Sequence, residues 1–246
     1  MTIKIKAKVL HKFLKSAFVL NGEKDVKSTH SMADAHLDFR EDALYVYGKH
    51  SLGTMAMFSK MDKEMFDEYS TLSVMVQSTD KLMKVLSSFK DKLINITVDD
   101  NKLYLIDEKS NVVFGFPKEV ECSRDYYDYS LDFKIDLDKD EIKQFLDRCE
   151  MFEISAIEIT NKNNLLMFKG KTSTVNGVEL VVDSNESKSF NMRMNKYVMS
   201  AIISSFDPHT FELQMSSEND KHFVAVVNID EDNKTKNEYV VSCIKK

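Results

Sequence analysis

Three aspartates at alternate positions could begin a cation site. Asp136, Asp138 and Asp140 have the spacing of the first oxygen ligands of a calcium-binding loop. A complete loop also needs a glycine at its sixth position and a glutamate at its twelfth, where this sequence has Glu141 and Asp147. The run is better explained as a helix start, because Asp138 and Glu141 form a capping-box pattern. We therefore expect no metal ion and no cofactor here.

Motifs for catalysis are absent from the sequence. It contains no GxxxxGKS or GxxxxGKT phosphate loop, no GxGxxG turn and no HExxH zinc motif. His30, His36 and His50 lie close together, but no cysteine or carboxylate spacing completes a metal site, so we expect surface histidines. We therefore expect a protein that is not an enzyme. The three cysteines lack the CxxC spacing of a zinc site and give no disulfide framework: Cys122, Cys149 and Cys243.

Clustered basic residues are the remaining chemical signal. From Lys4 to Leu20 the chain carries five lysines and no acidic residue, although its formal net charge is -6. A solvated face is the simpler interpretation of any one basic helix, but basic residues recur on the expected outward sides of four helices, which favours a function. The recurring set is Lys8, Lys12, Lys15, Lys81, Lys84, Lys139, Lys143, Arg148, Arg193 and Lys196.

Hydrophobic periodicity predicts the elements that position these residues. Apolar residues at helical spacing predict one helix within each of the ranges 4–20, 78–90, 135–160 and 195–206. Alternating apolar residues between the helices predict antiparallel strands. The expected strands lie around 44–46, 55–57, 72–76, 94–98, 103–105, 112–114, 157–160, 165–168, 178–182, 190–194, 211–215, 223–229 and 239–244.

The order of these elements repeats, which predicts a tandem of two like halves. Lys12-Phe13-Leu14 matches Gln144-Phe145-Leu146, and Ser87-Ser88-Phe89 matches Ser204-Ser205-Phe206. The expected fold class is α+β, with two helices packed on antiparallel sheets in each domain. The predicted organisation is domain 1 at 1–116, an acidic, tyrosine-containing connector at 117–132 and domain 2 at 133–246.

Length and composition agree with two ordinary domains. The chain has 246 residues, of which 43% are hydrophobic. It has no apolar run of about 18 residues, and its first residues lack the apolar block of a signal peptide. We expect a soluble cytoplasmic protein without a membrane partner.

Three segments carry a resemblance to a known family. DEIKQFLDRCEMFEISAIEIT, SSFDPHTFELQM and EYVVSCI, read with the order of elements, resemble the DNA sliding clamps, and most closely those of T-even bacteriophages. The last two segments also look like the proliferating cell nuclear antigen. The resemblance implies a pseudo-six-fold homotrimeric ring around double-stranded DNA, with the basic helices inside. Implied partners are a polymerase C-terminal peptide, a clamp loader and other replication or transcription factors.

Helix width gives a check on the number of subunits. At ~10 Å per helix, twelve helices side by side leave a hole of roughly 28 Å, whereas eight leave only about 15 Å. A duplex whose major groove alone is ~8.5 Å deep needs the larger hole. With four helices in each chain, three chains fit.

The resemblance also implies two protein-binding regions. Apolar strands that pair between neighbouring chains, head to tail, are expected at Val112, Val113, Phe114, Val178, Leu180 and Val182. A groove for client peptides is expected at Leu52, Tyr126, Tyr127, Pro208, Val241 and Ile244. The alternative is a clamp-like scaffold that binds proteins without encircling DNA, which a monomeric mass in solution would favour.

Overall fold

The structure is a computed structural model. It describes residues 2–18, 34–49, 55–77, 79–99, 102–115, 133–172, 177–205, 208–216, 222–232 and 234–245. These fall into two compact units: unit 1 comprises 1–126 and 229–237, and unit 2 comprises 127–228 and 238–246. The predicted connector at 117–132 lies outside the described residues. None of the described helices has the length and apolar character needed to cross a membrane.

Unit 1 contains the first predicted pair of helices and two antiparallel sheets. One sheet has the strand order β1-β6-β7-β8, and the other contains β4-β3-β2-β5. The strand β2 was not predicted, although Ala35, Leu37 and Phe39 alternate along it as buried residues. The elements are β1 (Ile3–Lys6), α1 (Ala7–Ala17), β2 (Asp34–Phe39), β3 (Ala43–Lys49), β4 (Met55–Asp62), the short 3-10 helix η2 (Lys63–Met65), β5 (Leu72–Gln77), α2 (Thr79–Phe89), β6 (Leu93–Asp99), β7 (Lys102–Ile106) and β8 (Asn111–Gly115).

Unit 2 repeats this order of strands and helices. Its strands form one antiparallel path, β12-β11-β10-β13-β16-β15-β14-β9. Here β10 lies between β11 and β13. The elements are β9 (Phe133–Asp138), α3 (Lys139–Met151), β10 (Ala156–Lys162), β11 (Leu165–Lys171), β12 (Gly177–Asp183), β13 (Phe190–Asn195), α4 (Lys196–Ser204), β14 (Thr210–Ser216), β15 (His222–Asp230) and β16 (Thr235–Lys245).

A late segment of the chain completes unit 1. The first residues of β16 lie next to β4, and the amide of Asp62 donates to the carbonyl of Lys234 over 3.1 Å. The ammonium group of Lys234 also forms an ion pair with Glu64. The side-chain amide of Asn237 donates to the hydroxyl of Ser16 on α1, over 3.3 Å. The segment 229–237 therefore covers the outer edge of β4 within this unit.

The strand pairings confirm the predicted duplication. β1 pairs with β6 as β9 pairs with β14, and β2 lies between β3 and β5 as β10 lies between β11 and β13. β4 pairs with β3 in unit 1, as β12 pairs with β11 in unit 2. The predicted α+β class is thereby confirmed.

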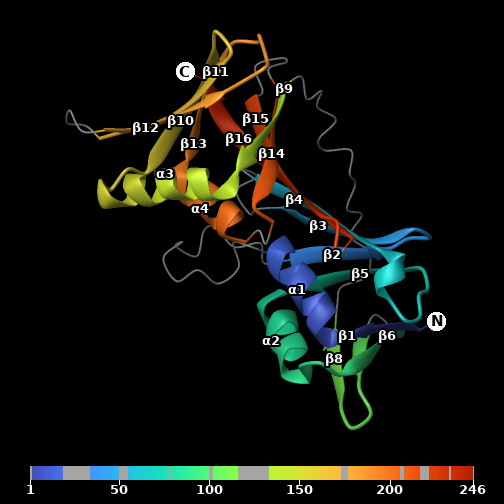
Figure 1. The fold of residues 1–246 in the computed structure, drawn as a ribbon. Coiled ribbons are helices and arrows are strands. Elements are labelled where there is room, and N and C mark those ends of the chain that lie inside the picture. Colours follow the sequence, from blue (N-terminus) through green and yellow to red (C-terminus); the bar gives the residue numbers. More distant parts are fainter. Residues whose placement is uncertain are drawn as a thin grey trace. The chain divides into compact units, whose positions relative to one another are not determined.

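The helices of each unit pack as a pair on the sheets. α1 contacts α2, and α3 contacts α4 (Figure 1). The predicted cap at Asp138 is confirmed, because its carboxylate accepts the amide of Glu141 over 2.9 Å. Asn195 caps α4 in the same way, accepting the amide of Tyr197 over 2.8 Å. Each cap holds a helix start at the end of the preceding strand, which fixes the direction of its exposed face.

Candidate nucleic-acid interface

The basic face predicted on α1 lies at the surface. Lys8, Lys12 and Lys15 are exposed, at positions that share one side of a helix. The opposite side is buried in the core through Leu10, Phe13, Leu14 and Ala17. Lys8 lies 3.3 Å from Asp91, but both side chains are more than 70% exposed, so this pair stabilises the fold by at most about 1 kcal/mol.

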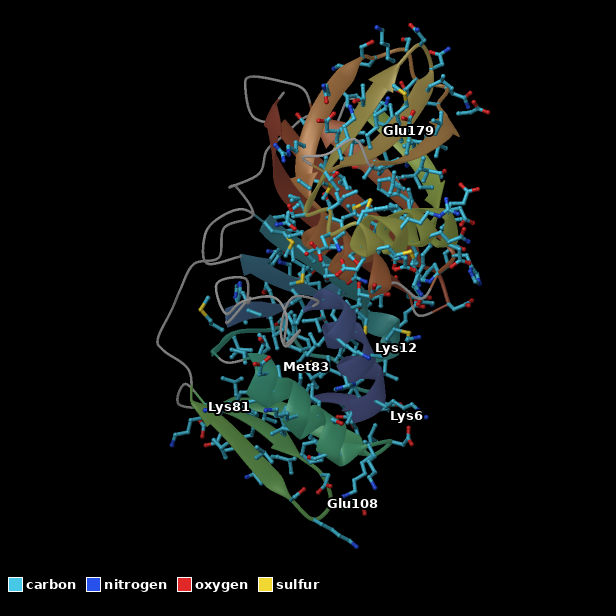
Figure 2. All side chains as sticks on the ribbon, turned by 90° about the vertical axis from the view of Figure 1, so that its left-hand side faces the viewer. Lys6, Lys12, Lys81, Met83, Glu108 and Glu179 are labelled. Atoms are coloured by element: carbon cyan, nitrogen blue, oxygen red, sulfur yellow. The ribbon has the colours of Figure 1, made fainter. Side chains whose placement is uncertain are left out.

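The neighbouring helix α2 adds two exposed lysines. Lys81 and Lys84 lie on its outer side, together with Asp80. Figure 2 shows Lys12 on α1, with Lys81 and Met83 on the adjacent α2. Both helices of unit 1 therefore carry exposed lysines.

The charge of this surface affects a histidine on α1. Burial lowers the pKa of His11, and the positive charge of Lys15 lowers it further. A depressed pKa keeps this imidazole neutral at physiological pH. The positive charge on α1 therefore comes from its lysines.

The corresponding surface of α3 is of mixed charge. Lys143 and Arg148 are exposed, and Lys139 is half-buried. Four acidic residues occupy the same helix, so the expectation of a basic outer side was wrong: Asp140, Glu141, Asp147 and Glu150.

The expected role of Lys196 is corrected by its position. This side chain is only 3% exposed, and its ammonium group forms an ion pair with Glu150. The ammonium group also lies 4.1 Å from the centre of the Tyr197 ring. Burial lowers the pKa of Lys196. Lys196 is the first residue of α4 and points to the core, so it cannot contact DNA from this position.

Arg193 is exposed, but it does not belong to a helix. It lies on β13, where its backbone is opposite that of Glu158 on β10 and that of Ile244 on β16. The residues of α4 after Lys196 carry no charge, because its sequence is KYVMSAIIS. Of the two residues predicted near α4, neither gives that helix an exposed cation.

The predicted subunit strands are the outer strands of their sheets. In the described part of the chain, β8 pairs with β7 alone and β12 pairs with β11 alone. Val113 of β8 is 47% exposed, and the residues Val112 and Phe114 beside it are half-buried. On β12, Val181 is 48% exposed and was missed by the sequence analysis. Val181 resembles Val113 in being an exposed valine on an outer strand, and this similarity could have identified Val181 as a candidate interface residue.

The duplication shows what covering such an edge does. Val178, Leu180 and Val182 of β12 are half-buried. By strand register, they match three residues of β4 that are at most 3% exposed: Met57, Ser59 and Met61. β4 has β16 at its outer edge and β12 has no corresponding strand among the described residues. β12 therefore carries apolar residues at the positions that are buried in β4, but no strand covers its outer edge among the described residues.

The predicted peptide-groove residues are only partly described. Leu52, Tyr126 and Tyr127 lie outside the described residues, as does the side chain of Ile244 on β16. Pro208 is half-buried. Val241 is 4% exposed, so the expectation that it lines a surface groove is corrected: it is a core residue of β16.

Metal binding finds no support in the described part of the chain, which contains no cluster of three or more metal-ligating side chains. His36 lies on β2 and is half-buried, and its Nε2 atom lies 2.6 Å from the hydroxyl of Ser73. Burial lowers its pKa. His30 and His50 lie outside the described residues.

Comparisons with known proteins identify the fold. The sequence matches no protein-family model and no curated protein. Among solved structures, a complex of the C-terminal region of FEN-1 with A. fulgidus PCNA is 14% identical, with a TM-score of 0.75 over 100% of this chain and 98% of that one. The PCNA2-PCNA3 complex from Sulfolobus tokodaii is 15% identical, with a TM-score of 0.70 over 99% of both chains.

A bacterial clamp gives the same result. The DnaN sliding clamp, DNA polymerase III subunit beta, from Pseudomonas aeruginosa bound to griselimycin is 13% identical, with a TM-score of 0.78. The match covers 100% of this chain and 66% of that one. Together with the duplicated strand order, these similarities show that the chain has the sliding-clamp fold.

Proposed function

We propose that this chain is a subunit of a DNA sliding clamp. Three copies form a closed ring around duplex DNA, and the ring tethers the replicative DNA polymerase so that synthesis is processive. The role requires binding and no catalysis. It is supported by the sliding-clamp fold and by the exposed lysines of α1 and α2.

The observation that carries this proposal is the pair of uncovered edges. Within unit 1, the first residues of β16 lie at the outer edge of β4. The duplication makes β12 the counterpart of β4, and β8 the counterpart of β16, because each ends its series of strands. Pairing β8 of one copy with β12 of the next would therefore repeat the pairing of β16 with β4.

The side chains of the two edges suit this pairing. Val112 and Phe114 are paired with the buried Leu105 and Leu103, so they lie on the core side of their sheet. Residues on the same face of adjacent strands contact each other. The joined strands would therefore continue the core from Val112 and Phe114 to the half-buried residues of β12. Uncovered apolar edges otherwise invite aggregation.

The join is head to tail, because β8 and β12 are different surfaces of the same chain. Heterologous contacts of this kind close into a ring only when the rotation between copies fits. The estimated hole of roughly 28 Å for twelve helices accommodates a duplex when three copies assemble. The number of copies is therefore set by the hole that DNA needs.

Client proteins would bind through short peptides. One of the similar structures is a PCNA with the C-terminal region of FEN-1, and we extend this kind of partner to the present chain. We expect a polymerase C-terminal peptide to contact the surface that includes Pro208, which is half-buried, and we expect a clamp loader to open the ring. Factors for replication or transcription could share this surface.

Light scattering at several concentrations tests the assembly. The predicted mass is three times the 28.4 kDa of one chain. The same measurement on a Met151→Glu variant provides a control, because Met151 is 79% exposed on α3 and not on either edge strand. A monomer at every concentration would overturn the ring and favour a scaffold that does not encircle DNA.

A further inference from the structure

We propose that the unit-1 helix pair, α1 and α2, supplies nearly all phosphate contacts of the ring, and that the unit-2 helix pair, α3 and α4, supplies almost none. The ligand is the sugar-phosphate backbone of duplex DNA. This inference rests on the proposed clamp function and divides its DNA contacts between the two units. A ring with six similar helix pairs would then attract DNA at three of them.

The duplication allows α1 and α3 to be compared position by position. Each helix follows directly on the first strand of its unit, after an extended residue with φ -66° at Lys6 and φ -74° at Asp138. Aligning these two residues also aligns the buried sides of the helices. The matched buried pairs are Leu10 with Ile142, Phe13 with Phe145, Leu14 with Leu146 and Ala17 with Cys149.

At these matched positions every lysine of α1 is lost in α3. All the residues that replace the lysines are exposed, so they occupy the same outer face. Two of them are acidic and the third is an uncharged amide. The pairs are Lys8 with Asp140, Lys12 with Gln144 and Lys15 with Asp147.

The second helices show the same difference. Aligning Ser87 and Ser88 of α2 with Ser204 and Ser205 at the end of α4 also matches the buried residues Leu82 and Met199. The exposed lysines of α2 then correspond to apolar residues: Lys81 with Val198 and Lys84 with the buried Ala201.

The same alignment explains the burial of Lys196. It corresponds to Thr79, which is 1% exposed in the first turn of α2. A position that faces the core in unit 1 therefore also faces the core in unit 2, whichever residue occupies it. The only cation of α4 is placed where phosphate cannot reach it.

Charges along the helices add up differently in the two pairs. α1 has three lysines and no acid, and α2 has two lysines and one aspartate, a formal net charge of +4. α3 has three basic and four acidic residues, and α4 has one lysine, a net charge of 0. Both helix pairs were predicted to be basic, but only the first is.

Distance decides whether the cations of α3 can act alone. Lys143 and Asp147 are four positions apart, so their side chains start about 5–6 Å from each other. The Debye length at physiological salt is about 8 Å. Opposite charges closer than this length largely cancel at the distance of a phosphate. α1 itself contains no acid, although Asp91 lies 3.3 Å from Lys8, and on α2 Asp80 lies four positions before Lys84.

Salt dependence of DNA binding tests the proposal. Fluorescence anisotropy with a labelled duplex is measured for the full chain between about 50 and 200 mM salt, where log affinity falls with a slope of about -0.9 for each phosphate contact. The unit-1 variant is K12Q/K15Q/K84Q. The matched unit-2 variant is K139Q/K143Q/R148Q, which removes the same formal charge, so a difference between the variants cannot come from net charge.

The expected result is a slope that becomes shallower by about 2 or more for the unit-1 variant and by less than about 1 for the unit-2 variant. A third variant, D140K/Q144K/D147K, gives α3 the lysine pattern of α1 and should make the slope steeper. Light scattering confirms that each variant keeps the oligomeric mass of the parent.

Two other outcomes are separable. Equal loss of slope in the unit-1 and unit-2 variants would overturn this inference and leave the clamp function standing. Absence of salt-dependent duplex binding by the parent protein would overturn both the inference and the proposed DNA contact.

Discussion

The carboxylate of Glu150, near the end of α3, forms an ion pair with the ammonium group of Lys196, the first residue of α4. Lys196 is 3% exposed at its side chain, whereas that of Glu150 is 62% exposed. The pair therefore joins the two helices of unit 2 and gives a buried cation its partner. This lysine serves the fold, and the surface charge that it was expected to provide is missing from α4.

We predict that Glu150→Gln lowers the free energy of unfolding by about 1–2 kcal/mol, because it leaves the Lys196 ammonium group buried without an anion. Lys196→Met removes that charge. It should lower the free energy of unfolding less in the Glu150→Gln background than in the parent. Urea unfolding of the four proteins of this double-mutant cycle measures the coupling. Additive effects would mean that the two side chains do not interact in solution.

Charges on the outer strands should separate the subunits. Val113→Glu and Val181→Glu each place a carboxylate on an edge that would be buried between copies. Because both positions are about half exposed in one chain, the fold should remain intact, while the dissociation constant should rise about 100-fold or more, which equals about 2.7 kcal/mol. Sedimentation and far-UV circular dichroism measure mass and fold. Variants that keep the parent mass at micromolar concentration would move the interface elsewhere.

A close contact between α3 and β11 predicts sensitivity at one glycine. A Cβ atom on Gly170 would lie 2.8 Å from the sulfur of Cys149 and 3.1 Å from two atoms of Ile154. Gly170→Ala should therefore destabilise the protein by about 1–3 kcal/mol. Adding Cys149→Ala removes the sulfur that lies closest to the new Cβ atom, so it should restore part of the lost stability. Alanine also occupies the matched position of α1, at Ala17. Equal stability of Gly170→Ala and the parent in urea would show that the site relaxes freely.

An aspartate at the β7–β8 turn predicts a loss of stability in acid. Asp107 accepts hydrogen bonds from Lys92 over 2.5 Å and from the hydroxyl of Ser110 over 2.7 Å. These bonds hold its pKa well below the ordinary value, with Lys92 as the largest cause. The stabilisation is fully present above about pH 4, the pKa of an unfolded aspartate, and is lost as the pH falls toward the lower folded pKa.

Asp107→Asn keeps an acceptor oxygen but cannot titrate. The difference in thermal midpoint between parent and variant should therefore be largest at neutral pH and shrink toward pH 3. Thermal unfolding by circular dichroism at pH 7, 5 and 3 measures it. A difference that stays constant over this range would remove the ionised carboxylate from the explanation.

Much of the fold could be predicted because its signals are local. The apolar spacing of Leu10, Phe13 and Leu14 and of Ile142, Phe145 and Leu146 identifies helices that bury one side. The repeated order of elements identifies the duplication. The strand β2 was not predicted, although Ala35, Leu37 and Phe39 alternate as buried residues along it.

The candidate site was harder to predict because exposure depends on how a helix is rotated against its neighbours. Lys196 and Lys81 are both lysines near a helix start, yet one is buried and the other is exposed. Only the alignment of α4 with α2 distinguishes them, because it matches Lys196 with the buried Thr79. The acidic residues of α3 were visible in the sequence and should have counted against a basic face.

Topological retention on DNA tests the central claim most directly. A linear duplex is attached to a bead by one biotinylated end, the protein threads on from the other end, and streptavidin then blocks that end. Washing with salt high enough to break phosphate contacts leaves only protein that is linked to the DNA as a closed ring. We predict that the protein survives this wash and is released when a restriction enzyme cuts the duplex. Loss of the protein from the blocked duplex in the same wash would contradict encirclement.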